Sequence, residues 1–246
     1  MNEKPYYFAY EKRYQAVYEA GFSRWGHSPD DAILYETLKN WVETNDLQGK
    51  KVAEFACGEG ACGVILSELG CIYTGFDISP SAVKKAKESL APYPNASVWV
   101  LDMVKEKAPD APYDAALDCM GLHMLITDSD RNAYLKNACA VLKENVPMLF
   151  FRESYRKDAY EGEVSSFEHW KRISGEDYDT PMKRTSRDGI DCYIPLLAAR
   201  AKTEKGYREE MSKAGFDVED FVPVDINEQC AFSATVFVRK AAKCRC

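Results

Sequence analysis

Residues 52–63 read Val-Ala-Glu-Phe-Ala-Cys-Gly-Glu-Gly-Ala-Cys-Gly, and this stretch decides the fold. An apolar run that contains one acid, Glu54, breaks into a glycine turn and continues as a helical pattern. A buried parallel strand presents a nucleotide-like ligand to a helix N-terminus in this way. Gly58, Gly60 and Gly63 also satisfy G-x-G-x-x-G, which by itself fits a dinucleotide enzyme as well as other nucleotide-binding proteins.

Strand-like and helical segments alternate downstream of this turn. The strand-like runs are residues 51–55, 72–76, 97–101, 113–118 and 147–151, and the helical runs between them are 61–69, 80–90 and 130–142. Strands that are separated by helices are joined by right-handed crossovers into a parallel sheet. The pattern therefore predicts a doubly wound α/β core, which we place at residues 50–152.

The region before the core, residues 1–49, predicts a helical lid made of two helical segments that are separated by Gly26–Asp30. Ser28 followed by Pro29 is typical of the start of the second helix. The apolar face of that helix has helical spacing and consists of Ile33, Leu34, Leu38 and Trp41.

The region after the core divides into two parts. Residues 153–203 are rich in charged and aromatic side chains, and we expect an insertion that caps the active site and carries a small hairpin around Gly189. Residues 204–246 predict a helix followed by two strands, Phe216–Val224 and Ala231–Arg239, in an antiparallel hairpin. Such a closing hairpin is unusual for a dinucleotide-binding fold.

Composition excludes several classes of protein. The chain of 246 residues is 46% hydrophobic and 29% charged, which is ordinary for a globular protein with a full core. A formal charge of −7 argues against nucleic acid as the main partner, because binding to phosphates requires clustered Lys and Arg. No secretory leader or long apolar run is visible, so we expect a cytoplasmic protein without a membrane partner.

The cysteines and histidines predict neither a disulfide framework nor a metal site. The nine cysteines are odd in number and scattered, and the three histidines lie far apart in the sequence. No Cys/His spacing matches a known set of ligands. We expect Cys244 and Cys246 to lie in a frayed tail with reduced thiols.

The stretch around the glycine turn resembles the S-adenosylmethionine site of class I methyltransferases. The resemblance rests on Glu54 four residues before Gly58, on the Cys-Gly-x-Gly turn, and on Gly75-Phe76-Asp77 at the end of the second strand. It covers residues 50–151 and extends loosely through the final hairpin. It implies a seven-stranded, mostly parallel sheet with an antiparallel C-terminal strand, and S-adenosylmethionine as cofactor, with S-adenosylhomocysteine as product. Ala56 stands where many members have glycine, a mild departure.

The same resemblance assigns roles to the residues that follow each strand. Glu54 helps to position the methionine ammonium, Asp77 binds both ribose hydroxyls, and Asp102 lies against the adenine amino group. Ile78 and Met103 sandwich the adenine ring. The full set of implied cofactor-binding residues is Glu54, Ala56, Gly58, Gly60, Asp77, Ile78, Asp102, Met103, Asp118 and Cys119.

The methyl acceptor has fewer candidate residues. His123 follows the fourth strand and is the best candidate for a general base, although a packing role is also common for a histidine at this place. Asp118 is a second candidate. Tyr10, Tyr14 and Trp25 lie in an aromatic N-terminal segment and are candidates for enclosing a cationic group, whereas Arg13 and Arg24 suit a carboxylate. These five side chains come from one short stretch, residues 10–25.

Three functions remain open at this stage. The leading hypothesis is a methyltransferase that acts on an O, N or S atom of a small molecule, as a monomer or homodimer. A NAD(P)-dependent oxidoreductase explains Gly58, Gly60 and Asp77 but not Asp102 or the closing hairpin. A regulatory protein that binds S-adenosylmethionine without catalysis is the third hypothesis.

Overall fold

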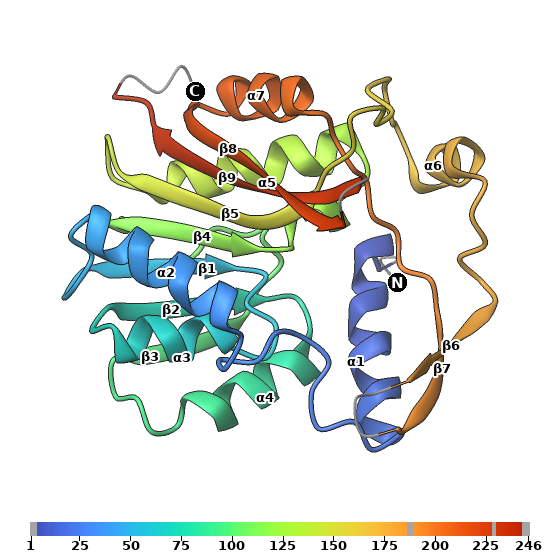
Figure 1. Ribbon diagram of the computed structural model, residues 1–246, viewed down its shortest axis with the longest axis horizontal. Coiled ribbons are helices and arrows are strands. Elements are labelled where there is room, and N and C mark those ends of the chain that lie inside the picture. The colour runs from blue at the N-terminus through green and yellow to red at the C-terminus, as the bar shows by residue number, and fades with distance from the viewer. Residues whose placement is uncertain (1–3, 186–188, 228–229, 243–246) are drawn as a thin grey trace.

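A seven-stranded sheet forms the centre of the molecule, with the strand order β3-β2-β1-β4-β5-β9-β8 (Figure 1). The computed structural model describes residues 4–185, 189–227 and 230–242. The strands are β1 (Lys51–Phe55), β2 (Ile72–Asp77), β3 (Ala96–Val100), β4 (Ala115–Cys119), β5 (Pro147–Ser154), β8 (Phe216–Asn227) and β9 (Cys230–Lys240). Strands β1 to β5 pair in parallel, and β9 lies antiparallel between β5 and β8. This confirms the predicted mostly parallel sheet with an antiparallel C-terminal strand.

Helices cover both faces of the sheet (Figure 1). One face packs against α2 (Ala32–Thr44), α3 (Ala61–Glu68) and α4 (Pro80–Leu90), and the other against α5 (Asp128–Ala140) and α7 (Glu204–Lys213). Neighbouring residues of β1 point to opposite faces, so Val52 joins the first core and Ala53 and Phe55 join the second. A strand that is buried on both sides is mostly apolar, and in β1 only Lys51 at the start and the buried Glu54 are charged.

The start of α2 differs from the prediction. Asp31, rather than Ser28, is the N-cap, because its Oδ1 accepts hydrogen bonds from the backbone N–H groups of Ile33 and Leu34 at 3.0 and 3.1 Å. Ser28 instead closes a turn, in which its carbonyl oxygen accepts from the N–H of Asp31. Ile33 therefore lies in the first helical turn on the outer side, 59% exposed, and is not part of the apolar face.

Other boundaries shift by a few residues. Strand β4 begins at Ala115, two residues later than predicted. Tyr113 lies outside the strand and forms an isolated β-bridge with Leu142. The insertion contains a helix that the sequence did not predict, α6 (Phe167–Ser174), and the predicted hairpin, β6 (Pro181–Thr185) paired with β7 (Asp191–Pro195). Cys244 and Cys246 lie outside the described residues.

The N-terminal segment and the insertion together cover the carboxyl edge of the sheet. After the short helix η1 (Tyr6–Phe8), α1 (Ala9–Glu19) runs beside this edge and packs against α4 and β7 (Figure 1). A small apolar cluster that includes Val17, Phe22 and Ile194 ties α1 to β7. Both segments thus lie at this edge of the sheet, and their roles as a lid and a capping insertion stay predictions.

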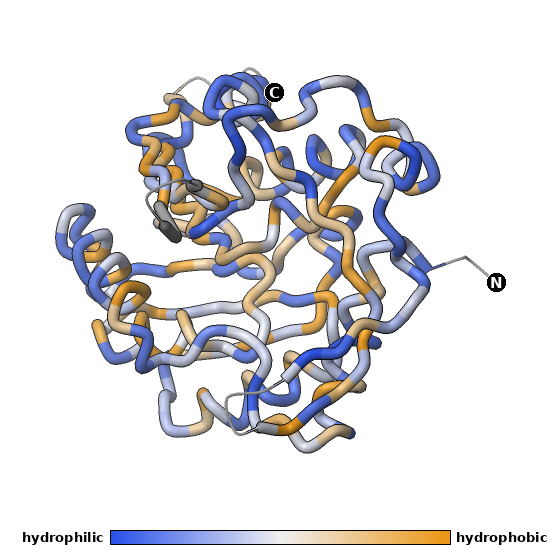
Figure 2. The backbone as a smooth tube through the Cα atoms, turned by 45° about the vertical axis from the view of Figure 1, so that its right-hand side comes forward, coloured by the Kyte–Doolittle hydropathy of each residue, from blue (hydrophilic) through white to orange (hydrophobic). Residues whose placement is uncertain are grey.

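Hydrophilic and hydrophobic residues alternate along the outer helices, as the change between blue and orange in Figure 2 shows. Within the described part of the chain, no helix combines the length and apolar character needed to cross a bilayer. The apolar side chains face the sheet from both sides, which is the pattern of a layered α/β domain.

Candidate functional site

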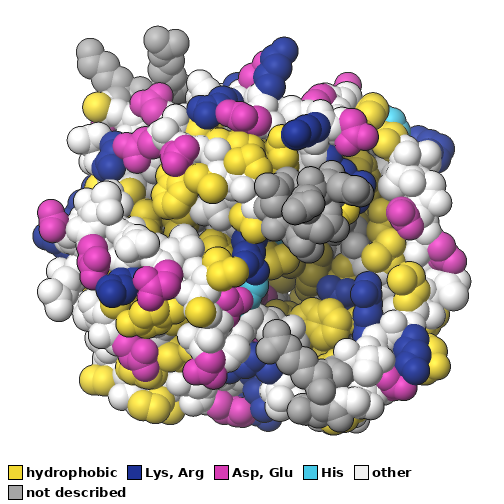
Figure 3. All heavy atoms as spheres, viewed as in Figure 1, with side chains coloured by type: hydrophobic (Ala, Val, Ile, Leu, Met, Phe, Trp, Pro, Cys, Tyr) yellow, Lys and Arg dark blue, Asp and Glu magenta, His cyan; other side chains and the backbone are white. Residues whose placement is uncertain are grey.

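A cavity of about 1380 Å³ lies at the carboxyl ends of β1, β2 and β4, beneath α1. The strand order reverses between β1 and β4, and open α/β sheets bind their ligands at such a switch point. Figure 3 shows the hollow in the face of the molecule, with apolar and basic side chains on its walls. Small-molecule sites usually occupy ~300–1,000 Å³, so this cavity has room for a nucleoside cofactor and a second small molecule.

The glycine turn between β1 and α3 brings the backbone to the wall of the cavity. Gly58 and Gly60 have φ angles of 51° and 80°, in the left-handed region that favours glycine. A Cβ at Gly58 would lie 3.0 Å from the hydroxyl oxygen of Tyr14, so the missing side chain lets Tyr14 of α1 approach the turn closely. Gly60 does not line the cavity; it is the N-cap of α3 and packs against α4.

Ala56 occupies a strained backbone position at the start of the same turn. Its φ angle is 57°, and an L-residue in this region costs ~1–2 kcal/mol relative to the right-handed conformation. A Cβ at Gly121 would lie 2.5 Å from the Cβ of Ala56. The alanine is therefore a larger departure than the sequence alone indicates, and its methyl group requires glycine at position 121.

Asp77 ends β2 and binds the glycine turn. Its Oδ2 accepts from the N–H of Gly58 and its Oδ1 from the N–H of Ser79, both at 2.8 Å. Each carboxylate oxygen still has the capacity to accept from a second donor, such as a ribose hydroxyl. Burial raises the pKa of Asp77 to about 6, although these two backbone bonds oppose the rise.

Glu54 lies deeper in the cavity and is only 1% exposed. The hydroxyl of Tyr73 donates a hydrogen bond to Glu54 Oε2. Burial raises the pKa of Glu54 to about 8, because desolvation penalises the charged form. A cation in the cavity would reverse this shift and favour the carboxylate.

Asp102 lies where the sequence predicted an adenine contact, together with a tyrosine that the sequence analysis did not assign to the site. The Tyr7 hydroxyl lies 3.2 Å from both carboxylate oxygens of Asp102. Asp102 Oδ1 also accepts from the N–H of Val104 at 3.1 Å, so this acid closes a turn as well. Ile78 and Met103 line the same part of the cavity.

His123 reaches the cavity from the segment after β4 and is held by Glu153 on β5. Its ring Nδ1 lies 2.9 Å from Glu153 Oε2, which also accepts from the backbone N–H of His123 at 2.7 Å. Burial lowers the pKa of His123 to about 4 and raises the pKa of Glu153 to about 7. The sequence analysis missed Glu153; the signal available was an acid just past the fifth apolar run.

Asp118 does not line the cavity, whereas Cys119 does. Asp118 is fully buried behind it, where it accepts from the N–H of Gly121 at 2.6 Å and from the hydroxyl of Tyr134. Burial raises the pKa of Asp118 well above its usual range. This acid therefore fixes the segment between β4 and His123 rather than facing a ligand.

The N-terminal aromatic residues Tyr10, Tyr14 and Trp25 all line the cavity. The Tyr10 hydroxyl donates to the carbonyl oxygen of Ala198 at 3.3 Å, which joins α1 to the insertion. The backbone N–H of Trp25 lies 3.0 Å from both carboxylate oxygens of Glu59 in the glycine turn. In the described part of the chain, no group of three or more His, Cys, Asp or Glu side chains is placed to hold a metal ion.

A sequence model of the methyltransferase domain family matches residues 52–145, which contain the glycine turn, Asp77, Asp102 and His123. Among curated proteins, a ribosomal protein L11 methyltransferase from Aeromonas hydrophila is 26% identical over 163 residues, which are 61% of this chain and 52% of the relative. The chain thus spans about half the length of that relative.

Solved structures of similar fold cover nearly the whole chain. The CcbJ methyltransferase from Streptomyces caelestis has a TM-score of 0.67 and 15% identity, over 98% of this chain and 100% of its own. The 1,6-didemethyltoxoflavin-N1-methyltransferase from Burkholderia thailandensis, solved with S-adenosylhomocysteine, has a TM-score of 0.65 and 15% identity, over 98% and 92%. An S-adenosylmethionine-dependent methyltransferase from Clostridium acetobutylicum has a TM-score of 0.64 and 15% identity, over 96% and 99%. At this identity the likeness shows the fold.

The strand order and the antiparallel β9 are those of the class I methyltransferase fold, and the glycine turn and the acids of β1 and β2 line its cavity. The sequence match identifies residues 52–145 as a methyltransferase domain within that fold. S-adenosylmethionine is accordingly its cofactor, in place of the nicotinamide dinucleotide of the rival hypothesis.

Proposed function

We propose that the protein transfers a methyl group to a nitrogen, oxygen or sulfur atom of a small molecule. The observation that carries the proposal is the cavity itself, which extends from the cofactor residues at β1 and β2 to α1 and the insertion. Thr185 and Leu197 of the insertion line it together with Tyr10 of the lid. A second ligand bound there would be largely enclosed, as a small molecule is in its binding site.

The cofactor residues support one orientation of S-adenosylmethionine. The free acceptor capacity of Asp77 suits the two ribose hydroxyls, and Asp102 with Met103 suits the adenine at the end of the cavity near β3. The buried Glu54 suits the ammonium of the methionine part. The sulfonium would then face Cys119 and His123.

When bound, S-adenosylmethionine supplies a methyl group on a positively charged sulfur, and the C–S bond breaks as the acceptor lone pair bonds to the methyl carbon. The chain mainly has to hold the acceptor in line with that bond. The walls formed by α1 and the insertion exclude water and restrict the acceptor. Enclosure of this kind suits a reaction that needs positioning more than a protein nucleophile.

His123 is proposed to orient the acceptor. Glu153 Oε2 accepts a hydrogen bond from the backbone N–H of His123 and also lies next to Nδ1 of its ring. Because this oxygen acts as an acceptor, Nδ1 carries the proton and donates to it, and Nε2 keeps its lone pair. With a pKa of about 4, the imidazole is neutral at pH 7 and is a weak base. It therefore accepts a hydrogen bond from an N–H or O–H of the acceptor and takes up a proton only as the nucleophile becomes positively charged.

The acidic composition supports a small molecule rather than nucleic acid as the partner. We further propose that the protein is cytoplasmic, does not bind membranes and acts as a monomer or homodimer. Light scattering on the purified protein would determine the oligomeric state. A complex with nucleic acid that persists at physiological salt would contradict this part of the proposal.

Calorimetric titration with S-adenosylmethionine, S-adenosylhomocysteine and NADH tests the cofactor, and transfer of a labelled methyl group to a panel of small molecules tests the reaction. We expect both adenosyl ligands to bind, NADH not to bind, and label to appear on a small acceptor. Ribosomal protein L11 belongs in the panel, because the curated relative is named for it. Label on that protein alone would contradict a small-molecule acceptor, and binding without transfer would favour the regulatory hypothesis.

A further inference from the structure

Among the described residues, the half-buried arginines that line the cavity have no carboxylate within ion-pair distance, whereas the fully buried arginines of the core do. Arg131 pairs with Glu210 at 2.7 Å and Arg200 pairs with Asp128 at 2.6 Å. Arg13 and Arg152 line the cavity, and neither has a carboxylate within ion-pair distance in the described parts of the chain. In a chain with a net charge of −7, unpaired cations gathered at one cavity require an explanation.

Arg13 projects from α1 and is held by an aromatic ring rather than by an acid. Its guanidinium carbon lies 4.6 Å from the centre of the Trp25 ring, and its buried Nε has no hydrogen-bond partner among the residues described. Burial lowers the pKa of Arg13, and the positive charge of Arg184 on β6 lowers it further. The two guanidinium groups thus lie near enough for their positive charges to repel.

Arg152 enters the cavity from the carboxyl end of β5. Its guanidinium lies 5.2 Å from the centre of the Phe151 ring, and its buried Nε likewise has no partner in the described structure. Asp31 is near enough for Arg152 to contribute to its lowered pKa. That acid is committed elsewhere, since it caps α2 and contacts His27 at 3.2 Å.

The other acids of the cavity are engaged as well. Asp77 accepts from two backbone N–H groups, Asp102 from Tyr7 and a backbone N–H, and Glu59 from the backbone of Trp25. Both arginines are half-buried, and each keeps a buried Nε without a hydrogen-bond partner among the described residues while its side chain lines the cavity. An anionic ligand in the cavity would supply the missing acceptor.

We propose that the methyl acceptor carries an oxyanion, a carboxylate or a phosphate, which binds between Arg13 and Arg152. The planar guanidinium fork matches both groups through paired hydrogen bonds. An aromatic ring lies beside each arginine, and that of Trp25 also lines the cavity and would contact the apolar part of the same molecule. This inference rests on the proposed small-molecule methyltransferase function.

The cofactor has a single carboxylate of its own. Arg24 also lines the cavity and donates to the carbonyl oxygen of His27 at 2.8 Å. It adjoins Trp25, which binds Glu59 in the glycine turn, so Arg24 is on the side of the cofactor. One cofactor carboxylate bound there leaves Arg13 and Arg152 to the acceptor.

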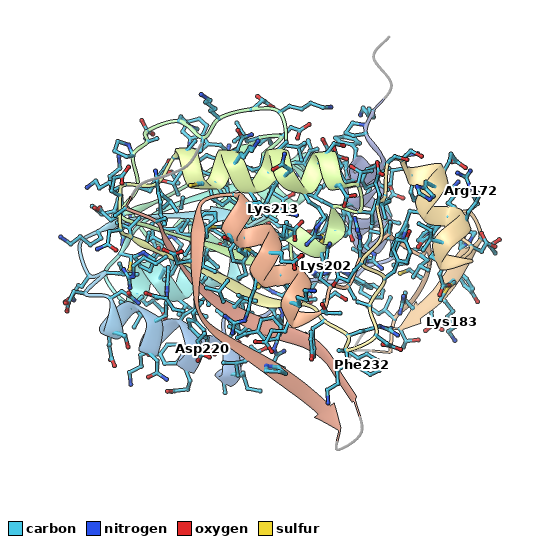
Figure 4. All side chains as sticks on the ribbon, turned by 90° about the horizontal axis from the view of Figure 1, so that it is seen from above. Arg172, Lys183, Lys202, Lys213, Asp220 and Phe232 are labelled. Atoms are coloured by element: carbon cyan, nitrogen blue, oxygen red, sulfur yellow. The ribbon has the colours of Figure 1, made fainter. Side chains whose placement is uncertain are left out.

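The test uses benzoate, phenyl phosphate and the neutral analogue benzamide as probes, with dissociation constants measured by ligand-observed NMR on the full chain, with and without saturating S-adenosylhomocysteine. The variants are Arg13→Gln and Arg152→Gln. Arg172→Gln is the matched control, because Arg172 is exposed on α6 at the periphery of the molecule (Figure 4). Calorimetry measures the affinity of each variant for S-adenosylhomocysteine.

We expect benzoate or phenyl phosphate to bind about tenfold or more tightly than benzamide, and each cavity variant to lose about tenfold of that affinity. The affinity for S-adenosylhomocysteine should stay within about twofold, and Arg172→Gln should behave as the wild type. Whichever anion binds more tightly identifies carboxylate or phosphate as the group recognised.

Equal binding of benzamide and the anions, or anion binding unaffected by both variants, would overturn the inference. So would a loss of S-adenosylhomocysteine affinity in both variants with anion binding intact, because the arginines would then hold the cofactor. If the wild type fails to bind S-adenosylhomocysteine at all, the proposed function fails. The titrations without cofactor still decide the role of the arginines.

Discussion

Binding of S-adenosylmethionine at neutral pH should release a proton from Glu54. This carboxyl group is buried at the end of β1, and its pKa is raised to about 8 because the charged form is desolvated. The ammonium of the methionine part brings a positive charge to the cavity, and a neighbouring cation favours the carboxylate. Glu54, which is protonated in the absence of cofactor, would therefore become ionised in the complex.

The size of the effect follows from the pKa of Glu54, about 8. A group with this pKa is ~90% protonated at pH 7 and ~10% protonated at pH 9. Asp77, with a pKa of about 6, carries only a small fraction of a proton at pH 7. We therefore expect the release of about one proton per S-adenosylmethionine at pH 7 and almost none at pH 9.

The assay is calorimetry in two buffers of equal pH and different ionisation enthalpy. A released proton is taken up by the buffer, so the difference between the two binding enthalpies, divided by the difference between the ionisation enthalpies, gives the number of protons released. Glu54→Gln should abolish the release at pH 7 and weaken binding. Glu68→Gln should leave both unchanged, because Glu68 lies exposed at the end of α3 and away from the cavity. A wild type without buffer dependence at pH 7, or a Glu54→Gln variant that still releases a proton, would refute the reasoning.

The same shift predicts a pH dependence of stability in the absence of cofactor. The pKa of Glu54 in the folded chain is above its value in the unfolded chain, so the stability it contributes is complete below about pH 4.5 and is lost as the pH rises through about 8. Because Gln cannot ionise, the Glu54→Gln variant should unfold at a higher temperature than the wild type above pH 8. Equal melting temperatures at pH 9 would contradict this expectation.

Three further predictions concern single residues. Asp77→Asn should weaken binding of S-adenosylhomocysteine by ~10–100-fold, since a charged acceptor of hydrogen bonds is lost; calorimetry measures it, and unchanged affinity in a folded variant would contradict the assignment. Ala56→Gly should stabilise the protein by ~0.5–1 kcal/mol, because relief of the left-handed strain exceeds the entropy cost of glycine; a lower melting temperature would contradict it. His123→Gln should lower the rate of methyl transfer by ~10–100-fold with S-adenosylhomocysteine affinity unchanged, and a wild-type rate would leave this histidine a packing role.

The sheet and the cofactor end of the site were predictable because their signals are local. The central parallel strands are buried on both faces, so their apolar runs are visible in the sequence, and Asp77 ends such a run in β2. The glycines of the turn are required by the positive φ angles at Gly58 and Gly60. Helix starts were less predictable: Asp31 and Ser28 are both acceptable N-caps, and only the packing of α2 selects between them.

The side chains that hold the site residues in place were not predictable, because they meet them only through the fold. Tyr7 reaches Asp102 across 95 positions of the sequence, and Glu153 reaches His123 across 30. In the sequence, Arg152 stands beside the acid Glu153 and looks like half of a neutralised pair. In the structure, Glu153 contacts His123 instead, and Arg152 lines the cavity. The φ angle of Arg152, 53°, marks the bulge in β5.

The different positions of Arg152 and Glu153 have a chemical consequence. Because Arg152 lies in the bulge of β5, these two consecutive residues supply a cation to the cavity and an acid to His123. The distance between a bound oxyanion and the atom that receives the methyl group would then be set by the spacing of two adjacent residues on one strand. The residues on either side of Arg152 are held by strand pairing, Phe151 with Cys119 of β4 and Glu153 with Ala234 of β9, and a strand end fixed in this way positions a small molecule better than a loop does. The selectivity of the acceptor site should therefore reside in β5 and α1 as well as in the insertion residues that line the cavity.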